Sequence, residues 1–134
     1  MKSYIVDAVA FLAYLADNLP LEADKIFKKA EKKEIILFLP SIALGETLFT
    51  IYKGKEIFGK NIPTEKIDLI FQILQNREMI QLVSLDLDAW KIFHELTIPE
   101  MHDRMIVATY HYYKASAIIT NDPEIEELVP IIWQ

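Results

Sequence analysis

The sequence predicts an α/β fold, a three-layer α/β/α sandwich with a central, mainly parallel sheet of four to five strands. Apolar runs of strand length alternate with longer helical patterns along the chain. Strands that are separated by helices pair in parallel, because each helix carries the chain back across the sheet. The 134 residues are 52% hydrophobic and 25% charged, which is typical of a packed globular protein. At this length we expect one domain, residues 1–134.

The first half of the chain contains two strand patterns and four helical patterns. Residues 4–6 are β-branched and aromatic, and residues 35–39 form a continuous apolar run of the kind found in strands covered on both faces. Helical patterns cover residues 8–18, 20–34 and 41–57. After a break at residues 59–63, Thr64 is expected to cap a helix with one apolar face, formed by Ile67, Ile70, Phe71 and Leu74.

The second half repeats the alternation. Strands are predicted at residues 79–83 and 117–120, and a last strand at residues 131–133. Between them lie helical patterns at residues 85–96, 101–114 and 123–128. The helix at residues 85–96 is expected to face inward with its apolar side chains, namely Leu85, Ala89, Ile92, Phe93 and Leu96.

Composition excludes several classes of protein. The absence of cysteine excludes disulfide scaffolds, thiolate zinc, iron–sulfur clusters and a cysteine nucleophile. The net charge of −6 excludes a generic basic wrapper of nucleic acid. The longest uncharged run, residues 35–45, is shorter than the roughly 20 residues of a membrane span and contains Pro40. We therefore expect a cytoplasmic protein without a membrane partner.

Acidic residues stand where ligands bind in such sheets, beyond the carboxyl ends of the strands. Asp7 ends the first predicted strand, and Asp122 follows the strand at residues 117–120. Each also has a simpler explanation, since Asp7 can cap the helix after it and Asp122-Pro123 has the composition of a helix start.

Two further carboxylates lie within helical patterns. Glu46 shares a helix face with Ile42 and Phe49 in a segment with few polar residues, so it should face a cleft, a counter-ion or a metal. Asp103 shares a face with Ile106, although an acid in a first helical turn also suits the helix dipole. Together the four carboxylates make a hard oxygen site that suits Mg²⁺ or Mn²⁺ and phosphoryl chemistry.

These residues resemble the PIN (PilT N-terminal) domain family over almost the whole chain. Residues 4–7 look like its opening strand and first Asp, and Glu46 stands where the family has a Glu after the second strand. Residues 103–108 match its Asp-x-x-Ile-x-Ala stretch, and residues 120–122 match its Thr-x-Asp. At position 9, where the family often has Ser, Thr or Asn, this chain has Val9, and the loss of a small polar side chain there would lower metal affinity or activity.

The resemblance implies a metal-dependent endoribonuclease similar to the toxin of VapBC-type toxin–antitoxin pairs. By that resemblance Asp7, Glu46, Asp103 and Asp122 are both the catalytic residues and the ligands of Mg²⁺ or Mn²⁺. The products would carry 5′-phosphate and 3′-hydroxyl ends. The family also implies an RNA substrate, a homodimer and a small antitoxin protein as partners.

Other polar residues carry weaker signals. His102 and Arg104 flank Asp103 and are candidates for substrate binding, whereas His94 and His111 make no metal set with His102. Lysines of the helix at residues 20–34 are most simply a solvated surface. Residues 1–66 carry 10 basic and 9 acidic side chains and residues 67–134 carry 4 and 11, giving +1 and −7. Four of the acids belong to the proposed site, and Glu124 with its acidic neighbours is expected to be ordinary surface.

Two alternatives stay open. One is a non-catalytic PIN-like module that binds RNA or a protein, which Val9 favours. The other is a different Mg²⁺-dependent phosphoryl-transfer enzyme. A haloacid-dehalogenase-type phosphatase would need Asp-x-Asp after the first strand, but Asp7 is followed by Ala8 and Val9.

Overall fold

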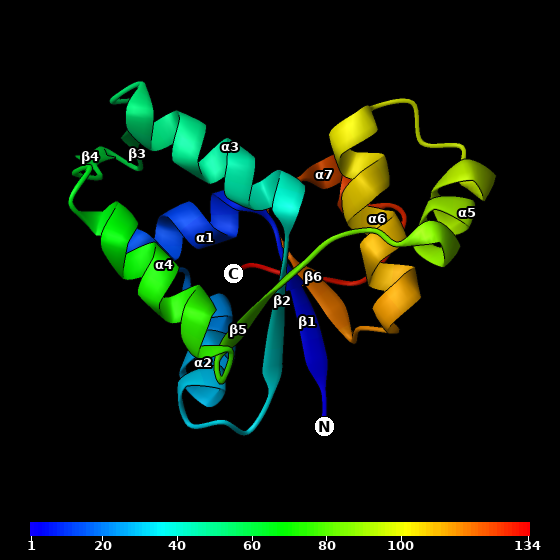
Figure 1. The fold of residues 1–134 in the computed structure, drawn as a ribbon, viewed down its shortest axis with the longest axis horizontal. Helices are drawn as coiled ribbons and strands as arrows, with labels where there is room; N and C mark the ends of the chain where they lie inside the picture. The colour runs from blue at the N-terminus through cyan, green and yellow to red at the C-terminus, as the bar shows by residue number, and fades with distance from the viewer.

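The computed structural model describes all 134 residues and has the predicted α/β/α architecture (Figure 1). Its main sheet has five parallel strands in the order β5-β2-β1-β6-β7. These strands are β1 (Ser3–Val6), β2 (Ile36–Pro40), β5 (Ile80–Val83), β6 (Ala117–Ile119) and β7 (Ile131–Ile132). The helices are α1 (Ala8–Leu15), α2 (Leu21–Glu31), α3 (Ser41–Tyr52), α4 (Lys66–Asn76), α5 (Leu87–Glu95), α6 (Met101–Tyr113) and α7 (Pro123–Glu126).

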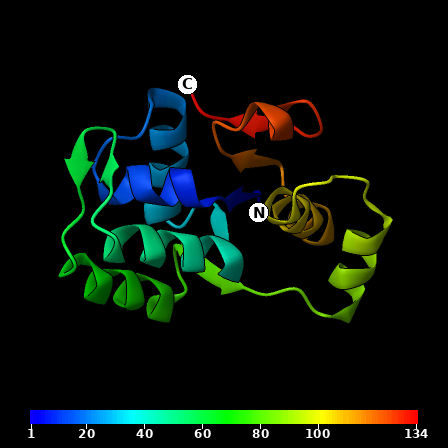
Figure 2. The same cartoon turned by 90° about the horizontal axis from the view of Figure 1, so that it is seen from above.

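The strand order explains how the helices form two layers. From β1 the chain moves outward to β2 and β5, and then crosses back to β6 on the other side of β1. Because parallel crossovers are right-handed, the change of direction puts the later helices on the opposite face. Figures 1 and 2 show α1 to α4 on one side of the sheet and α5 to α7 on the other.

The core lies against both faces of the three central strands. Side chains of these strands are fully buried, including Ile5, Leu37, Leu39 and Ile118. Phe11 of α1 and Phe27 of α2 fill the space on one side. The continuous apolar runs in the sequence therefore correspond to strands that are covered on both faces, as expected.

The segment after α3 differs from the prediction. The helix ends at Tyr52 instead of continuing to residue 57, and the chain forms an antiparallel hairpin of β3 (Glu56–Ile57) and β4 (Lys60–Asn61). Its two-residue turn, Phe58-Gly59, has positive φ at both positions, and such turns match the twist of a hairpin. Thr64 does not cap the next helix, which begins at Lys66 without a side-chain capping bond.

Burial of two helices also differs from the prediction. In α4, Ile70 and Leu74 are buried, but Phe71 is 49% exposed. Helix α5 begins at Leu87, with Asp86 as its capping residue, and only Ala89 is fully buried. The reason is that α5 packs beside α6 at the edge of the molecule and not on the sheet (Figure 2). None of the seven helices combines the length and apolar character that crossing a bilayer requires.

Candidate metal centre

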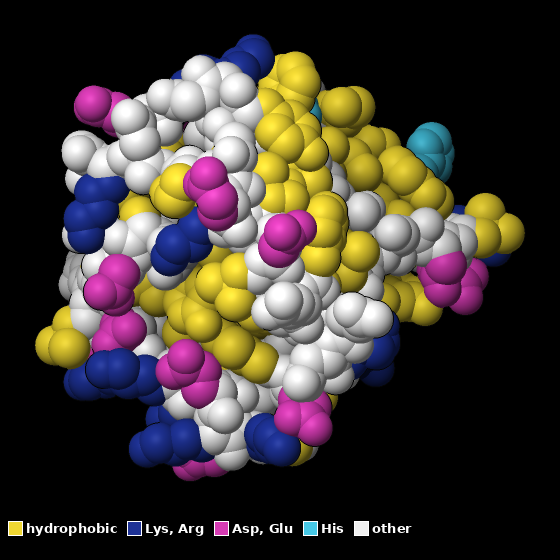
Figure 3. All heavy atoms as spheres, turned by 60° about the vertical axis from the view of Figure 1, so that its left-hand side comes forward, with side chains coloured by type: hydrophobic (Ala, Val, Ile, Leu, Met, Phe, Trp, Pro, Cys, Tyr) yellow, Lys and Arg dark blue, Asp and Glu magenta, His cyan; other side chains and the backbone are white.

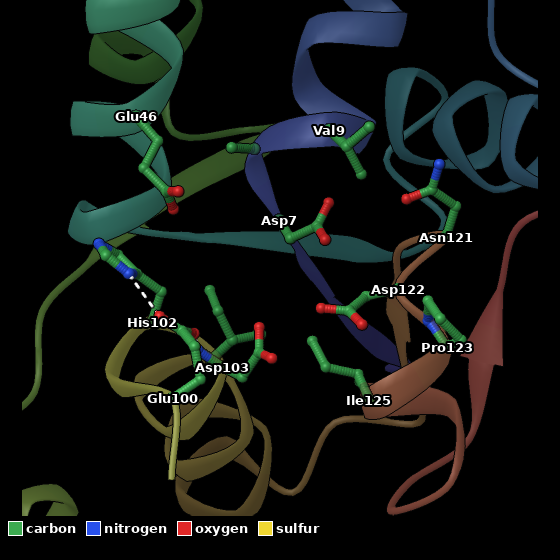
Figure 4. Close-up of a pocket in the computed structure, with 12 residues that line it drawn as sticks. Asp7, Val9, Glu46, Glu100, His102, Asp103, Asn121, Asp122, Pro123 and Ile125 are labelled. Carbon is green, nitrogen blue, oxygen red and sulfur yellow. Dashed lines mark hydrogen bonds and ion pairs between the residues drawn. The ribbon is translucent and has the colours of Figure 1, made fainter. Parts of the chain in front are cut away.

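A cavity of about 640 Å³ opens at the carboxyl ends of β1 and β6. This is the point where the strand order reverses, and ligands of open parallel sheets bind there. All four carboxylates singled out in the sequence line it, from four different elements: Asp7, Glu46, Asp103 and Asp122 (Figure 4). The fold therefore brings together residues that lie up to 115 positions apart in the chain.

Asp7 is held by contacts to both of its carboxylate oxygens. Oδ1 accepts a hydrogen bond of 3.0 Å from the backbone N–H of Ala10, so Asp7 is also the N-cap of α1. Oδ2 accepts a hydrogen bond from the hydroxyl of Thr120. The sheet register causes this second contact, because Val6 pairs with Ile119 and the next residue of each strand is Asp7 and Thr120.

Asp122 is positioned by the same threonine. The backbone N–H of Asp122 donates to Thr120 Oγ1 at 3.1 Å, and Asp122 Oδ1 caps α7 by accepting from the N–H of Glu124 at 2.8 Å. Asp7 and Asp122 thus have the capping roles that the simpler explanation gave them. Each nevertheless lines the cavity, so capping a helix and facing a ligand site are compatible for both residues.

Glu46 lies on the second turn of α3 and points into the cavity from the side opposite Asp122 (Figure 4). The helix face that it shares with Phe49 is a surface, since Phe49 is 60% exposed and the buried positions of α3 are Ala43, Thr47 and Ile51. Glu46 therefore faces a cleft, which is one of the three surroundings predicted for it from the sequence, beside a counter-ion and a metal.

The first turn of α6 supplies Asp103 together with a pair of polar neighbours. Glu100 caps this helix, accepting from the backbone N–H of Asp103 at 2.6 Å. Its other oxygen lies 2.8 Å from Nδ1 of His102. Both Glu100 and His102 line the cavity, so His102 lies where it can meet a substrate.

The electrostatics of the cavity favour a bound cation. Burial raises the pKa of Asp7 to about 7, although its hydrogen bonds with Thr120 and Ala10 oppose the shift. Burial together with the neighbouring carboxylate of Asp122 raises the pKa of Asp103 to about 7. Burial also raises the pKa of Glu46, and His102 opposes that shift. Several carboxylates in one cavity ionise together only when positive charge is supplied.

Glu124 lies close to two of the predicted ligands. One carboxylate oxygen from each of Asp103, Asp122 and Glu124 lies within 4.8 Å of the others, an arrangement that could hold a metal ion. Glu124 is exposed, as expected for a surface residue, and does not itself line the cavity, whereas Glu100, for which no role was predicted from the sequence, does. The signal for both was their position two or three residues from a predicted ligand at a helix start.

Arg104 does not line the cavity, contrary to the substrate-binding role expected of it. Its guanidinium donates to the backbone carbonyls of Phe93 at 2.7 Å, His94 at 3.0 Å and Ile98 at 3.4 Å. It also lies over the ring of Phe93, 4.8 Å from the centroid. Arg104 therefore ties the end of α5 to the start of α6.

The remaining weaker signals have structural explanations. His94 and His111 are exposed and do not line the cavity. On the exposed face of α2, Lys25 and Lys28 pair with acidic residues of their own helix. These lysines form the solvated surface that the sequence predicted.

Val9 lines the cavity beside Asp7 without offering a hydrogen bond (Figure 4). The two oxygens of Asp7 already have donors, in Ala10 and Thr120. A polar side chain at position 9 is therefore not needed to orient the carboxylate of Asp7.

Comparison with known proteins agrees with this geometry. The family model for the PIN domain matches residues 4–129. The structure is similar to that of VapBC2 from Rickettsia felis bound to a DNA fragment from their promoter, with a TM-score of 0.71 and 15% identity, over 99% of this chain and 100% of that one.

It is also similar to Mycobacterium tuberculosis VapC20, a Sarcin-Ricin loop cleaving toxin, with a TM-score of 0.61 and 12% identity over 92% and 93% of the two chains. At these identities the likeness concerns the fold alone. No curated protein matches the sequence. Because the family model covers nearly the whole length and the acidic cavity lies where the fold predicts it, the chain belongs to the PIN domain family.

Proposed function

We propose that this protein is a metal-dependent endoribonuclease that hydrolyses RNA phosphodiester bonds with Mg²⁺ or Mn²⁺. The observation that carries the proposal is the convergence of four carboxylates on one cavity at the switch point of the sheet. Asp7, Glu46, Asp103 and Asp122 are the ligands and catalytic residues in this proposal, and Glu124 joins them at its edge.

The donor set fits a hard divalent cation. It offers carboxylate oxygens and no sulfur, and oxygen ligands are what Mg²⁺ and Mn²⁺ prefer. Burial raises the pKa values of Asp7 and Asp103 to about 7, and the neighbouring carboxylate of Asp122 adds to both shifts, so a bound cation would stabilise the ionised forms. When bound, such an ion supplies activation of water and charge stabilisation at a phosphoryl centre.

The residues of the chain orient the site and bind the substrate. Thr120 and the start of α1 fix the Asp7 carboxylate, while the start of α7 fixes that of Asp122. The contact with Glu100 orients the ring of His102 and raises its pKa, which favours a ring that can donate to a phosphate oxygen. We infer that His102 contacts the substrate backbone beside Asp103.

We infer further that the protein acts as the toxin of a VapBC-type pair, as a homodimer silenced by a small antitoxin. The similarity to the R. felis VapBC2 and M. tuberculosis VapC20 structures supports this role. Exposed aromatic side chains also support a protein partner, since Phe49 and Tyr52 of α3 are each 60% exposed. Figure 3 shows hydrophobic side chains gathered between charged ones on the side of the molecule that carries α3 and α4.

Incubation with total RNA tests this proposal. With Mg²⁺ or Mn²⁺ we expect fragments with 5′-phosphate and 3′-hydroxyl ends, and no fragments in excess chelator. Asp103→Asn should remove cleavage, whereas Asp68→Asn, which changes an exposed carboxylate of α4 outside the cavity, should retain it.

Two results would overturn the assignment. RNA binding without cleavage would identify a non-catalytic module. Turnover of a phosphomonoester such as p-nitrophenyl phosphate, with RNA left intact, would identify a different phosphoryl-transfer enzyme.

A further inference from the structure

A second cavity adjoins the acidic one at the same edge of the sheet. Its volume is about 320 Å³, and it lies beyond the carboxyl end of the edge strand β7. Asn121 lies in the segment after β6, immediately before Asp122, and lines both cavities. A chain that crosses the four carboxylates can therefore place its next unit in the second cavity.

One wall of this second cavity is aromatic and apolar. Ile131, Ile132 and Trp133 form it. The indole of Trp133 is supported by Phe58 at the tip of the β3–β4 hairpin, with ring centroids 6.2 Å apart and an angle of 32° between the planes. A supported indole is a surface on which a flat base stacks.

The polar groups around this wall select what stacks there. Glu22 at the start of α2 and Glu126 of α7 line the cavity with carboxylates, which only accept hydrogen bonds. Their charge repels phosphate, so the occupant is the base of a nucleotide and not its phosphate. The base must also donate, and a carboxylate pairs best with two adjacent N–H groups.

Guanine is the base that meets these requirements. Its N1–H and N2–H₂ groups lie side by side and can both donate to one carboxylate. Its other edge carries the acceptors O6 and N7, which the amide of Asn121 can meet as a donor. Uracil has a single N–H, and adenine and cytosine each donate through one amino group.

We propose that this second cavity is a guanine-binding subsite for the nucleotide next to the scissile phosphate, with Trp133 as the stacking surface and Glu126 as the acceptor. The subsite rests on the proposed function, since it gives an RNA nuclease a preference for sequence. It names a substrate feature that the four carboxylates alone do not determine.

Nuclear magnetic resonance tests the subsite without catalysis or metal. The chain has two tryptophans, Trp90 and Trp133, so its spectrum has two indole N–H signals, which Trp90→Phe assigns. The probes are the four ribonucleoside 5′-monophosphates in chelator, which share a phosphate and differ in the base. We expect guanosine monophosphate to shift the Trp133 signal, at least tenfold lower affinity for the other three, and an unchanged Trp90 signal.

A matched pair of exposed glutamates provides the control. Glu126→Gln should weaken guanosine monophosphate binding about tenfold, because a neutral amide is a weaker acceptor than a carboxylate and offers one acceptor oxygen instead of two. Glu127→Gln removes the same charge from a residue that does not line the cavity and should leave binding unchanged. Both positions are exposed, so both variants should fold.

The outcomes separate the subsite from the nuclease. Equal shifts with all four nucleotides, no shift with any, or a Glu126→Gln variant that binds like the wild type would each overturn the guanine subsite, even if RNA is cleaved. Selective binding of guanosine monophosphate by a protein that cleaves no RNA would support the subsite and overturn the proposed function.

Discussion

Replacing Asp7 with asparagine should stabilise the metal-free protein. The carboxylate is enclosed at the end of β1, and burial raises its pKa from 3.8 to about 7. The folded state therefore disfavours the ionised form, which is the form present at pH 8. Asn retains an acceptor oxygen for the N–H of Ala10 and is as good a capping residue as Asp, but its amide nitrogen cannot accept from the hydroxyl of Thr120.

The magnitude follows from the pKa values. The difference between 3.8 and about 7, at about 1.4 kcal/mol per pH unit, corresponds to roughly 4 kcal/mol at pH 8. Because Asp7 is partly open to the cavity and the substitution removes the acceptor of the Thr120 hydrogen bond, the gain is smaller, and we expect about 1–3 kcal/mol. The sign depends on pH: the penalty is absent below pH 3.8, grows as the pH rises and is complete above pH 7.

Urea denaturation in chelator at pH 8 and at pH 4.5 measures the effect. Asp7→Asn should exceed the wild type in free energy of unfolding at pH 8 and approach it at pH 4.5. Asp68→Asn, at an exposed position of α4, should stay within about 0.5 kcal/mol of the wild type. A variant less stable than the wild type at pH 8, or a gain that is the same at both pH values, would refute the reasoning.

Three further predictions follow from the same contacts. Thr120→Val removes a fully buried hydroxyl that donates to Asp7 and accepts from the N–H of Asp122. It should therefore lower the free energy of unfolding by about 1–3 kcal/mol, and an unchanged urea midpoint would contradict this. Arg104→Met removes three hydrogen bonds to backbone carbonyls and should lower stability by about 2–3 kcal/mol, and Arg104→Lys should rescue it only in part, as followed by thermal unfolding. The affinity for Mn²⁺, measured by calorimetry, should rise between pH 5 and pH 8, because carboxyl groups with pKa values of about 7 must lose their protons before they can bind the ion. An affinity that does not change with pH would count against Asp7 and Asp103 as ligands.

The sheet and the acidic edge could be predicted because each depends on local pattern and one topological rule. Continuous apolar runs indicated strands covered on both faces, and the strands at 35–39 and 117–120 do lie on either side of β1. Parallel pairing then places the residues that follow the strands at one edge. That rule sufficed to bring Asp7 and Asp122 to one cavity.

The remaining features depend on packing that the sequence pattern does not contain. The β3–β4 hairpin was not predicted, because residues 53–57 continue the helical pattern of α3 in the sequence. In the structure the helix stops there because Gly54 has a positive φ, and the Phe58-Gly59 turn then reverses the chain. Arg104 stands beside Asp103 in the chain, but on a helix adjacent residues point in different directions, and Arg104 contacts α5. Glu124 is exposed, as predicted, but the start of α7 also brings its carboxylate near those of Asp103 and Asp122, which no local sequence pattern indicates.

Cleavage of a 5′-labelled RNA by the wild type and by Asp7→Asn, both in Mn²⁺, tests the central claim most directly. If the four carboxylates form the catalytic metal site, the variant should lose at least about a hundredfold in cleavage rate while being more stable than the wild type without metal. Cleavage by Asp7→Asn at the wild-type rate would contradict the assignment of this cavity as the site of RNA hydrolysis.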